Sequence, residues 1–491
     1  MKIKILNRNN WISIIFIFII FLFFSQTLLY TWKTASPYCR ADDWRFIDIY
    51  LKPFYNGDLQ LKDLWSDPTH PLPVYATFFI GSAKYFSLQI HYIARVAIFF
   101  QLFLGILIIF SFTKSLNGSK TISLLPIIAV ISLCSIIFSF IVQTPYTWAI
   151  MTSCYLGSFL VLIVGYFSDR YYLQTKTIYY KSLITIGLTL IISFLLYSDW
   201  TVIFCLSLLL VLIIIFCTEK IKRNKIILLG STLIISLLIG LFLFTFYLKQ
   251  NPSNLNINIT DSLTLFTDNP ILTLKSISIG MFSGILNFKW FVNTFEPGKK
   301  LYIIFSLIFM FTYLVVLVIY FTKRLYNKSI LPPTMMIYSL VFILSVLFFR
   351  YNPVDNGMLC LYWPRYIQFY QIGIIGYLWS LFLILNSVVE NKPKLRNGIL
   401  VLSCSITLIL IVLWTNDYRI NSKTSKYLKE RYPEVSCDIR DKLNNNEIEI
   451  PWSNQPNRDI SQQLKFLHDH ELNVFAPNYP YSAFTEKSFD P

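Results

Sequence analysis

Residues 11–30 read WISIIFIFIIFLFFSQTLLY, a run of apolar and a few small polar side chains with no charge. A helix of this length rises about 30 Å, which matches the hydrocarbon thickness of a bilayer. A helix also satisfies its own backbone hydrogen bonds in lipid. The run is too long for the apolar part of a signal peptide, and no convincing cleavage site follows it. We therefore expect an uncleaved membrane anchor.

Comparable apolar runs recur along the rest of the chain. Hydrophobic residues make up 55% of the sequence, charged residues make up 14%, and the mean hydropathy is +0.56. A soluble domain cannot hide so much apolar surface, so the sequence predicts an all-α polytopic membrane protein. The eleven predicted spans are residues 11–30, 92–112, 121–143, 146–167, 182–199, 201–217, 226–248, 301–321, 331–349, 371–387 and 399–415.

Lys and Arg gather in alternate connecting segments. Segments 1–10, 113–120, 168–181, 218–225, 322–329 and 388–398 hold 18 basic and three acidic residues, while the remainder holds 24 basic and 23 acidic ones. Short cytoplasmic loops retain positive charge. The pattern predicts an inner-membrane protein with its N-terminus in the cytoplasm and its C-terminus on the outer side. It also accounts for the net charge of +16 without nucleic-acid binding.

The long segments all fall on the predicted outer side, and they are 31–91, 249–300, 350–370 and 416–491. We expect a membrane domain over 1–415 and a small outer C-terminal domain over 416–491 that packs against the other outer loops. Stretches 43–51 and 72–90 suit interfacial helices, although 72–90 could also form a span. Stretch 271–291 contains Lys275 and Lys289 and is predicted to be partly embedded or interfacial.

Three cysteines, Cys39, Cys360 and Cys437, lie outside the predicted spans. A disulfide is chemically permitted on the outer side of the membrane, but the odd number leaves the pairing open.

The most suggestive polar cluster follows the first span directly and reads Arg40-Ala41-Asp42-Asp43-Trp44-Arg45. A carboxylate near lipid headgroups can act as a general base toward a hydroxyl, and its neighbour can orient that hydroxyl or hold a divalent cation. The alternative is that Asp42 and Asp43 only cap the helix that follows.

Two further polar residues in this region are candidates for binding phosphate. His70 stands in Asp67-Pro68-Thr69-His70-Pro71-Leu72-Pro73, where a structural role at the start of a helix is the alternative. Arg95 lies at the outer end of the second span, where a cation favours an anionic partner such as a lipid phosphate. Snorkelling to ordinary headgroups explains Arg95 equally well.

The third outer segment combines cations with aromatic rings. It contains Arg350 and the run Tyr362-Trp363-Pro364-Arg365-Tyr366. Aromatic faces stack on sugars and a guanidinium grips phosphate in a bidentate manner, so Arg350, Trp363 and Tyr366 are candidate sugar or acceptor contacts and Arg365 a phosphate contact. An aromatic belt at the interface has a similar composition. Asp199, in a tight turn between two spans, could face the same outer cavity or serve only the turn.

In order and residue type, these features resemble the bacterial GT-C glycosyltransferases, which use polyprenyl-phosphate-linked sugars. In that superfamily an acidic motif follows the first span, interfacial helices and six spans come next, and a second large outer loop appears. Asp42-Asp43 and segment 249–300 occupy these places. His70-Pro71-Leu72-Pro73 is similar to the His-Pro-Pro-Leu segment of protein O-mannosyltransferases and lipid A aminoarabinose transferases, with the second proline displaced.

Ala94-Arg95 resembles the Ala-Arg-Leu-Pro start of the second span in those enzymes, although Val96 and Ala97 replace Leu-Pro. The size and loop pattern also resemble the serotype-converting glucosyltransferases that modify O-antigen. The resemblance implies an inverting transfer of a sugar from polyprenyl phosphate to a hydroxyl of a cell-surface glycan or lipid. Asp42 or Asp43 would be the base, and Arg95 and Arg365, helped by His70, would neutralise phosphate.

The implied partners are the lipid-linked donor, a glycan or lipid acceptor and membrane lipids. No cofactor is required with certainty, although Asp42 and Asp43 could hold a divalent metal. An O-antigen polymerase or ligase is an alternative that would depend on arginine and histidine. A lipid-linked sugar flippase or other transporter is a third, and it would need charged residues within the spans, which here are nearly free of them.

Overall fold

Helices make up all the regular structure in the residues that the computed structural model describes, which are 8–39, 43–67, 73–116, 124–141, 152–174, 179–248, 270–350, 364–445 and 460–481. Eight of these helices are long and apolar enough to cross a membrane. They are α1 (Arg8–Thr34), α5 (His91–Ser115), α10 (Ser198–Thr218), α11 (Arg223–Leu243), α15 (Gly298–Thr322), α16 (Leu331–Arg350), α17 (Pro364–Asn391) and α18 (Arg396–Asn445). The chain is a multi-pass membrane protein, as predicted.

The three other predicted spans coincide with further helices, α6 (Leu124–Ile137), α8 (Thr152–Leu173) and α9 (Tyr179–Leu196). Within the described residues α6 and the apolar part of α9 are shorter than a full crossing of about 20 residues. A total of eleven spans therefore stays a prediction.

The helices expected at the interface are short. Helix α4 (Pro73–Phe86) has 14 residues and so rises only about 21 Å, which favours the interfacial interpretation of stretch 72–90 over a span. Stretch 271–291 forms two helices, α13 (Pro270–Ser283) and α14 (Phe288–Thr294), in place of the single helix that the sequence predicts. Asn287 separates them because its side chain accepts a hydrogen bond from the backbone N–H of Trp290 at 3.1 Å and caps α14.

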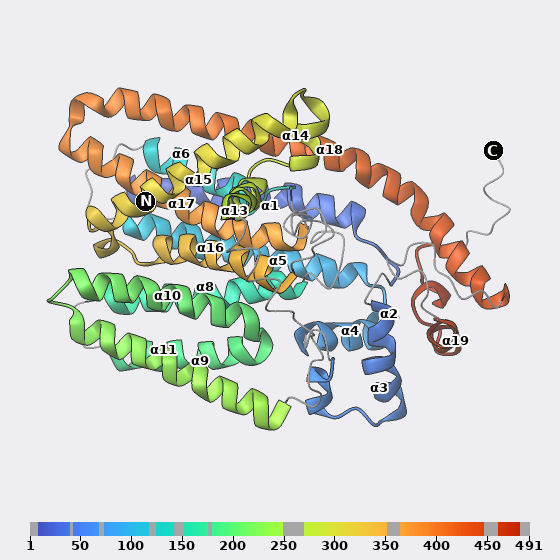
Figure 1. The fold of residues 1–491 in the computed structure, drawn as a ribbon. Coiled ribbons are helices and arrows are strands. Elements are labelled where there is room, and N and C mark those ends of the chain that lie inside the picture. The colour runs from blue at the N-terminus through green and yellow to red at the C-terminus, as the bar shows by residue number, and fades with distance from the viewer. Residues whose placement is uncertain are drawn as a thin grey trace, which may run out of the picture.

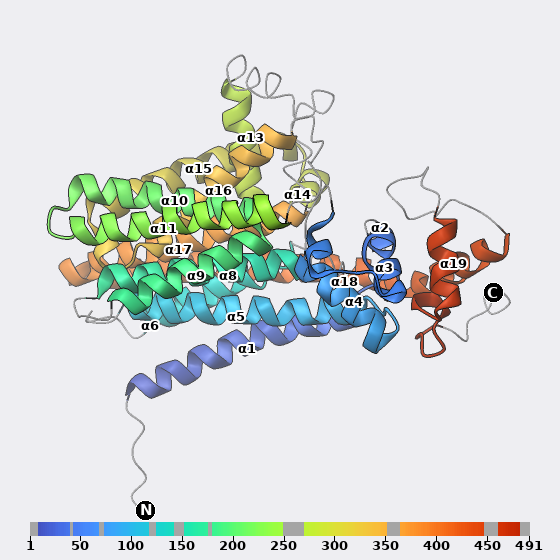
Figure 2. The ribbon, with the colours of Figure 1, turned by 90° about the horizontal axis from the view of Figure 1, so that it is seen from below.

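One end of the helix bundle carries a group of short helices that we call the platform (residues 43–67 and 73–86). It consists of α2 (Asp43–Phe46), the π-helix η1 (Ile47–Leu51), α3 (Lys52–Asn56), the 3₁₀-helix η2 (Leu61–Trp65) and α4. Figures 1 and 2 show the long helices running side by side, with the platform and α19 (Ser461–Asp469) together at one end.

Helix α18 connects the bundle to this end. It is 50 residues long and continues without a break through position 415, where the sequence predicts the boundary of a C-terminal domain. A helix of that length rises about 75 Å, much more than a bilayer requires. Its second half therefore extends beyond the bundle toward α19, as Figure 1 shows.

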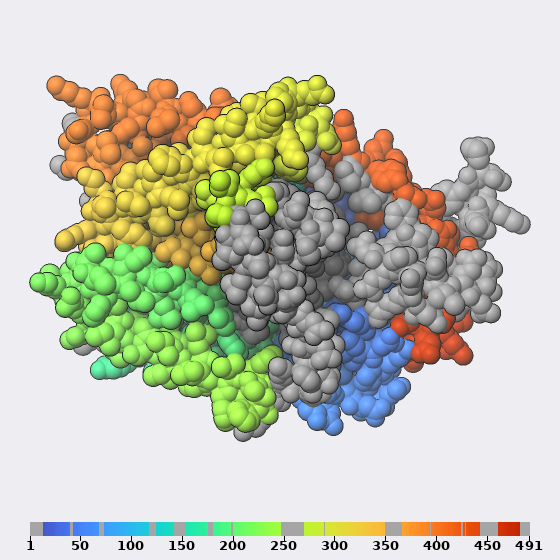
Figure 3. Space-filling view, viewed as in Figure 1, coloured from blue at the N-terminus to red at the C-terminus, as the bar shows by residue number. Residues whose placement is uncertain are grey.

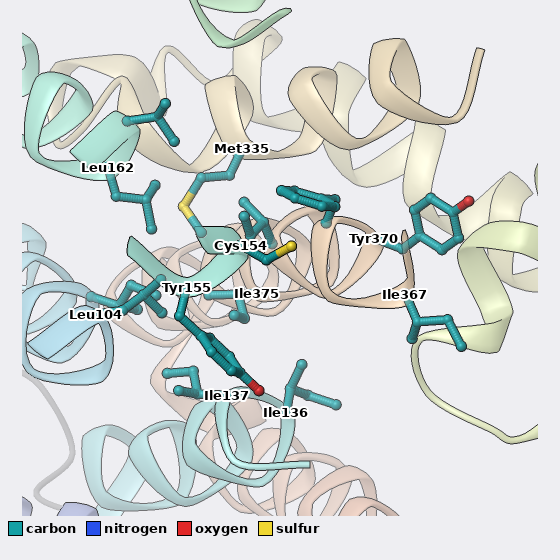
Figure 4. Packing of buried hydrophobic residues seen from close by; sticks show 14 of the residues in the cluster. Leu104, Ile136, Ile137, Cys154, Tyr155, Leu162, Met335, Ile367, Tyr370 and Ile375 are labelled. Atoms are coloured by element: carbon teal, nitrogen blue, oxygen red, sulfur yellow. The ribbon is translucent and has the colours of Figure 1, made fainter. Parts of the chain in front are cut away.

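The core of the bundle is apolar and closely packed. Figure 4 shows Leu104 of α5, Ile136 and Ile137 of α6, Cys154 and Tyr155 of α8, Met335 of α16 and Ile367, Tyr370 and Ile375 of α17 meeting at one place. On the face in Figure 3, side chains of α10 and α11 (green) adjoin those of α15 and α16 (yellow) in a continuous surface. Helices α11 and α15 also carry exposed apolar residues such as Leu238 and Phe311, as lipid-facing helices do.

Helices α16 and α17 approach each other closely because α17 carries glycine at the contact. A Cβ atom added at Gly376 would lie 2.6 Å from the carbonyl oxygen of Pro332 and 3.1 Å from the backbone nitrogen of Met336. Small residues allow membrane helices to pack backbone against backbone. We expect Gly376→Ala to destabilise the protein by about 1–3 kcal/mol, since backbone atoms must move apart. Thermal unfolding in detergent would measure this change.

Gly81→Ala in α4 is the matched control, because no heavy atom lies within 4 Å of the position of its added Cβ. Alanine is the better helix former by about 0.5–1 kcal/mol, so this variant should unfold at the same or a higher temperature. Equal thermal stability of Gly376→Ala and the wild type would show that the two helices are less tightly packed.

Candidate functional site

Asp43 occupies the first turn of α2, and its side chain is fully buried within the platform. The hydroxyl of Tyr75 in α4 donates a hydrogen bond of 2.5 Å to Oδ1 of Asp43. A distance this short is typical of a charge-assisted O–H···O⁻ bond. Tyr75 is itself held by Phe46 and Phe79, whose ring centroids lie 5.2 and 5.7 Å from its own. The aromatic residues of the platform thus hold the Asp43 carboxylate in one position.

The charge of Asp43 also acts on Cys39, the last described residue before α2. Burial raises the pKa of the Cys39 thiol well above its usual range, and the nearby Asp43 carboxylate raises it further. The thiol is therefore neutral and a poor nucleophile at physiological pH. Cys39 and Cys437 are both buried, and Cys360 lies outside the described residues.

A second buried carboxylate in the platform is paired with a cation. Arg45 Nη2 lies 2.7 Å from Oδ2 of Asp67, whose side chain has no exposed surface. The guanidinium also lies 5.4 Å from the centre of the Phe46 ring. Burial raises the pKa of Tyr50, and the Asp67 carboxylate raises it further. The ion pair joins α2 to the segment that follows η2, a contact between residues 22 positions apart that the sequence reasoning did not identify.

Arg95 is half-buried in the first turns of α5, beside the end of α1. Its guanidinium carbon lies 3.8 Å from the centre of the Trp32 ring and 5.2 Å from that of Tyr92. Nη2 also donates a long hydrogen bond of 3.4 Å to the Trp32 carbonyl oxygen. In the described part of the chain no carboxylate pairs with Arg95, and the faces of Trp32 and Tyr92 stabilise its charge.

Four other residues predicted to contact substrate belong to α10, α16 and α17. Asp199 is in the first turn of α10, Arg350 ends α16, and Arg365 and Tyr366 begin α17. The ring of Trp200 lies 4.9 Å from that of Phe369, and Phe342 lies 6.1 Å from Tyr366. These contacts bring the start of α17 close to the start of α10 and to the second half of α16, and the shared outer cavity stays a prediction. The side chains of Asp199, Arg350 and Arg365, and the whole of Trp363, lie outside what the structure describes.

Asp42 and His70 also lie outside the described residues. Within the described ranges no three His, Cys, Asp or Glu side chains gather closely enough to hold a metal ion. The proposed metal-binding role of Asp42 and Asp43 therefore stays a prediction.

The C-terminal segment 460–481 contacts the turn between α4 and α5 and the residues that follow α1. Asn473 Nδ2 donates to the carbonyl oxygens of Leu88 at 2.7 Å and Pro37 at 3.3 Å, and its backbone N–H donates to Ser87 at 2.8 Å. Ser87 and Leu88 have φ values of 50° and 57°. Asn473 thus stabilises a left-handed turn between α4 and α5 that non-glycine residues adopt at some cost.

Two further contacts connect the tail with the residues around Asp43. Gln463 in α19 donates to the Asp48 carboxylate, and the Tyr432 hydroxyl in α18 donates to the carbonyl oxygen of Thr34. These two contacts join the tail to the platform and to the end of α1, although the bonded residues are 415 and 398 positions apart in sequence.

Sequence reasoning missed Asp417, which lies just beyond the last predicted span and was assigned to the tail. In the structure it is part of α18 and only 4% exposed. Its position two residues after an apolar run could have identified it, because a helix that continues past the run would hold Asp417 at the membrane boundary.

Comparisons with protein families, with curated proteins and with solved structures found no match to this chain.

Proposed function

We propose that this chain is a glycosyltransferase that moves a sugar from polyprenyl phosphate to a hydroxyl group of a cell-surface glycan or lipid, such as O-antigen or another part of lipopolysaccharide. The observation that carries the proposal is the Asp43 carboxylate, which the Tyr75 hydroxyl holds at 2.5 Å within helices that directly follow the first span. A carboxylate in the helices that follow the first span would act at the depth where the lipid-linked donor and an acceptor from water come together, which is why we assign the base to this position.

The reaction requires little from the protein beyond position and charge. The acceptor hydroxyl attacks the anomeric carbon of the sugar, its proton passes to Asp42 or Asp43, and the bond between that carbon and the phosphate oxygen breaks. Lipid phosphate is already a good leaving group, so the enzyme must mainly align the two substrates and stabilise the departing charge. Inversion at the anomeric carbon follows from the single displacement.

Arg95 is proposed to stabilise the phosphate. Its guanidinium rests on Trp32 and Tyr92 at the ends of α1 and α5, where no carboxylate among the described residues competes for it. We expect Arg95→Gln to raise the KM for the lipid-linked donor about tenfold, the effect of one charge-assisted contact. Arg95→Lys should retain part of the affinity as a point charge.

Lys33→Gln provides the control for Arg95, because Lys33 is an exposed cation in the last turn of α1. This variant should leave the KM unchanged in the same vesicle assay. An equal loss in both variants would point to general attraction between basic residues and an anionic membrane, and would remove the specific role of Arg95.

The function is tested by the masses of surface glycans and lipids from cells with and without this protein. The proposal expects species that are heavier by one sugar residue only when the protein is present. Identical masses would overturn it. Retained transfer without either Asp42 or Asp43, together with loss on Arg350 or Arg365 substitution, would favour the polymerase or ligase alternative.

A further inference from the structure

Four carboxylates are buried in the part of the chain that the structure describes, and they are Asp43, Asp67, Asp169 and Asp417. The first three have a protein partner: the Tyr75 hydroxyl, the Arg45 guanidinium and the backbone N–H of Ile330, respectively. Among the described residues, no group donates a hydrogen bond to Asp417 and no cation pairs with it. Asp417 is therefore the exception that needs a physical explanation.

The position of Asp417 on α18 excludes a simple surface role. It lies on the side of the helix that faces the bundle, between two residues that bind the segment directly after α6. One turn before it, Trp414 Nε1 donates to the carbonyl oxygen of Phe138 at 2.9 Å. One turn after it, the Asn421 amide donates to the carbonyl oxygen of Phe140. Contacts on both sides thus hold this turn of α18 firmly in place.

The depth of Asp417 is close to the membrane boundary. The apolar part of α18 that is long enough to cross a membrane covers Arg396–Lys423. A charge within such a segment is costly, and charges kept there usually face the interior of the bundle and mark a site of function. Leu413, four residues earlier, packs against the apolar cluster formed by α13, α14 and α15, so an apolar residue at position 417 would meet suitable neighbours.

The neighbouring residue has the opposite hydrogen-bonding need. The Nδ2 atom of Asn416 is buried and has no hydrogen-bond partner. In this turn of α18, no described group donates a hydrogen bond to the Asp417 carboxyl group, and no group accepts one from Asn416 Nδ2. A hydroxyl group can both donate to a carboxylate and accept from an amide, whereas a metal cation would be repelled by the amide N–H.

We infer that Asp417, with Asn416, binds hydroxyl groups of the sugar at the membrane boundary. This inference rests on the proposed function, since it assigns Asp417 to the sugar of the same lipid-linked donor whose phosphate Arg95 is proposed to bind. The sugar of such a donor lies just outside the hydrocarbon region, at the depth where the apolar part of α18 ends. The two oxygens of the Asp417 carboxyl group can accept hydrogen bonds from sugar hydroxyls.

The first test compares the stability of two matched variants in the full-length protein. Asp417→Leu removes a buried carboxyl group that has no partner among the described residues, so the variant should unfold at the same or a higher temperature than the wild type. Asp169→Leu removes the acceptor that Ile330 N–H reaches at 2.6 Å and should unfold at a lower temperature. A loss of stability in Asp417→Leu comparable to that of Asp169→Leu would show a structural role and overturn the inference.

The second test measures binding to the purified protein in detergent. The probes are undecaprenyl phosphate and the same lipid carrying glucose, galactose or N-acetylglucosamine. The wild type should bind at least one sugar-carrying lipid more tightly than the bare lipid. In Asp417→Leu the affinity for that sugar-carrying lipid should fall about tenfold, and the affinity for bare undecaprenyl phosphate should not change. Asp417→Asn should lose less, since an amide oxygen still accepts a hydrogen bond.

The outcomes separate this inference from the proposed function. A sugar-dependent gain that persists in Asp417→Leu, or that is absent from the wild type, overturns the role of Asp417. Sugar-dependent binding that requires Asp417, without transfer to any acceptor in vesicles, supports the binding site and overturns the transferase. Full transfer by Asp417→Leu overturns the binding site and leaves the transferase in place.

Discussion

Replacing Asp43 with asparagine should lower the rate of sugar transfer by about 10²–10⁴-fold, the contribution of a general base. The amide oxygen of asparagine can still accept the hydrogen bond from Tyr75, so the packing of α2 on α4 should remain. The amide cannot take up the proton of an attacking hydroxyl. The measurement is the initial rate with purified protein in vesicles, accompanied by a melting curve that shows an unchanged fold.

Asp58→Asn is the control for Asp43, because Asp58 lies in the same segment but is exposed to solvent. It should transfer sugar at the wild-type rate. The variant Asp42→Asn decides which aspartate is the base, since only one of the two needs to accept the proton. Full activity in both Asp42→Asn and Asp43→Asn would remove the proposed base and with it the mechanism.

Replacing Arg45 with alanine should destabilise the protein by about 3 kcal/mol, because the variant leaves the Asp67 carboxylate buried without its cation. Arg45 is 21% exposed at its side chain, so water can reach the vacated position and the cost falls at the lower end of the usual range. Thermal or denaturant unfolding in detergent would measure the change. The platform should unfold before the rest of the protein, since the pair connects α2 to the segment beyond η2.

The double variant Arg45→Ala/Asp67→Ala should recover part of this stability, because it removes the buried charge as well as its partner. An exposed pair supplies the comparison. Lys426 and Glu430 lie 3.9 Å apart, with 81% and 64% of their side chains exposed. Lys426→Ala should have little effect on unfolding. A similarly small effect of Arg45→Ala would mean that Asp67 is not effectively buried.

Features that depend on one stretch of sequence were predictable. The apolar runs predicted the membrane helices because the hydrocarbon thickness sets the number of residues that a helix needs. The amphipathic stretches predicted the short helices of the platform, and the single stretch predicted at 271–291 divides at Asn287, whose cap favours a new helix start. Arg45 and Asp67 were both visible as charges, but their pairing depends on a fold in which segments 22 residues apart meet.

In the candidate site too, some features were predictable from one stretch of sequence and others depend on the fold. The sequence placed Asp43 after the first span, but the hydrogen bond from Tyr75 and the complete burial of the carboxylate follow from the packing of α4 on α2. The sequence analysis gave no role to Asp417, because hydropathy falls at Asn416 and suggests the end of a span. Helix α18 nevertheless continues to Asn445, held by contacts with α6 and α1 that hydropathy does not register.

By itself, the sequence determined that the chain is a membrane protein, that its fold is helical and which residues carry charge outside the apolar runs. These properties come from hydrophobicity and backbone hydrogen bonding, which act on each segment independently. Only the tertiary structure decided which charges are buried and which of those have partners. Burial and pairing depend on groups from distant parts of the chain meeting in space, as Asp43 meets Tyr75 and as Asp417 meets no described partner at all.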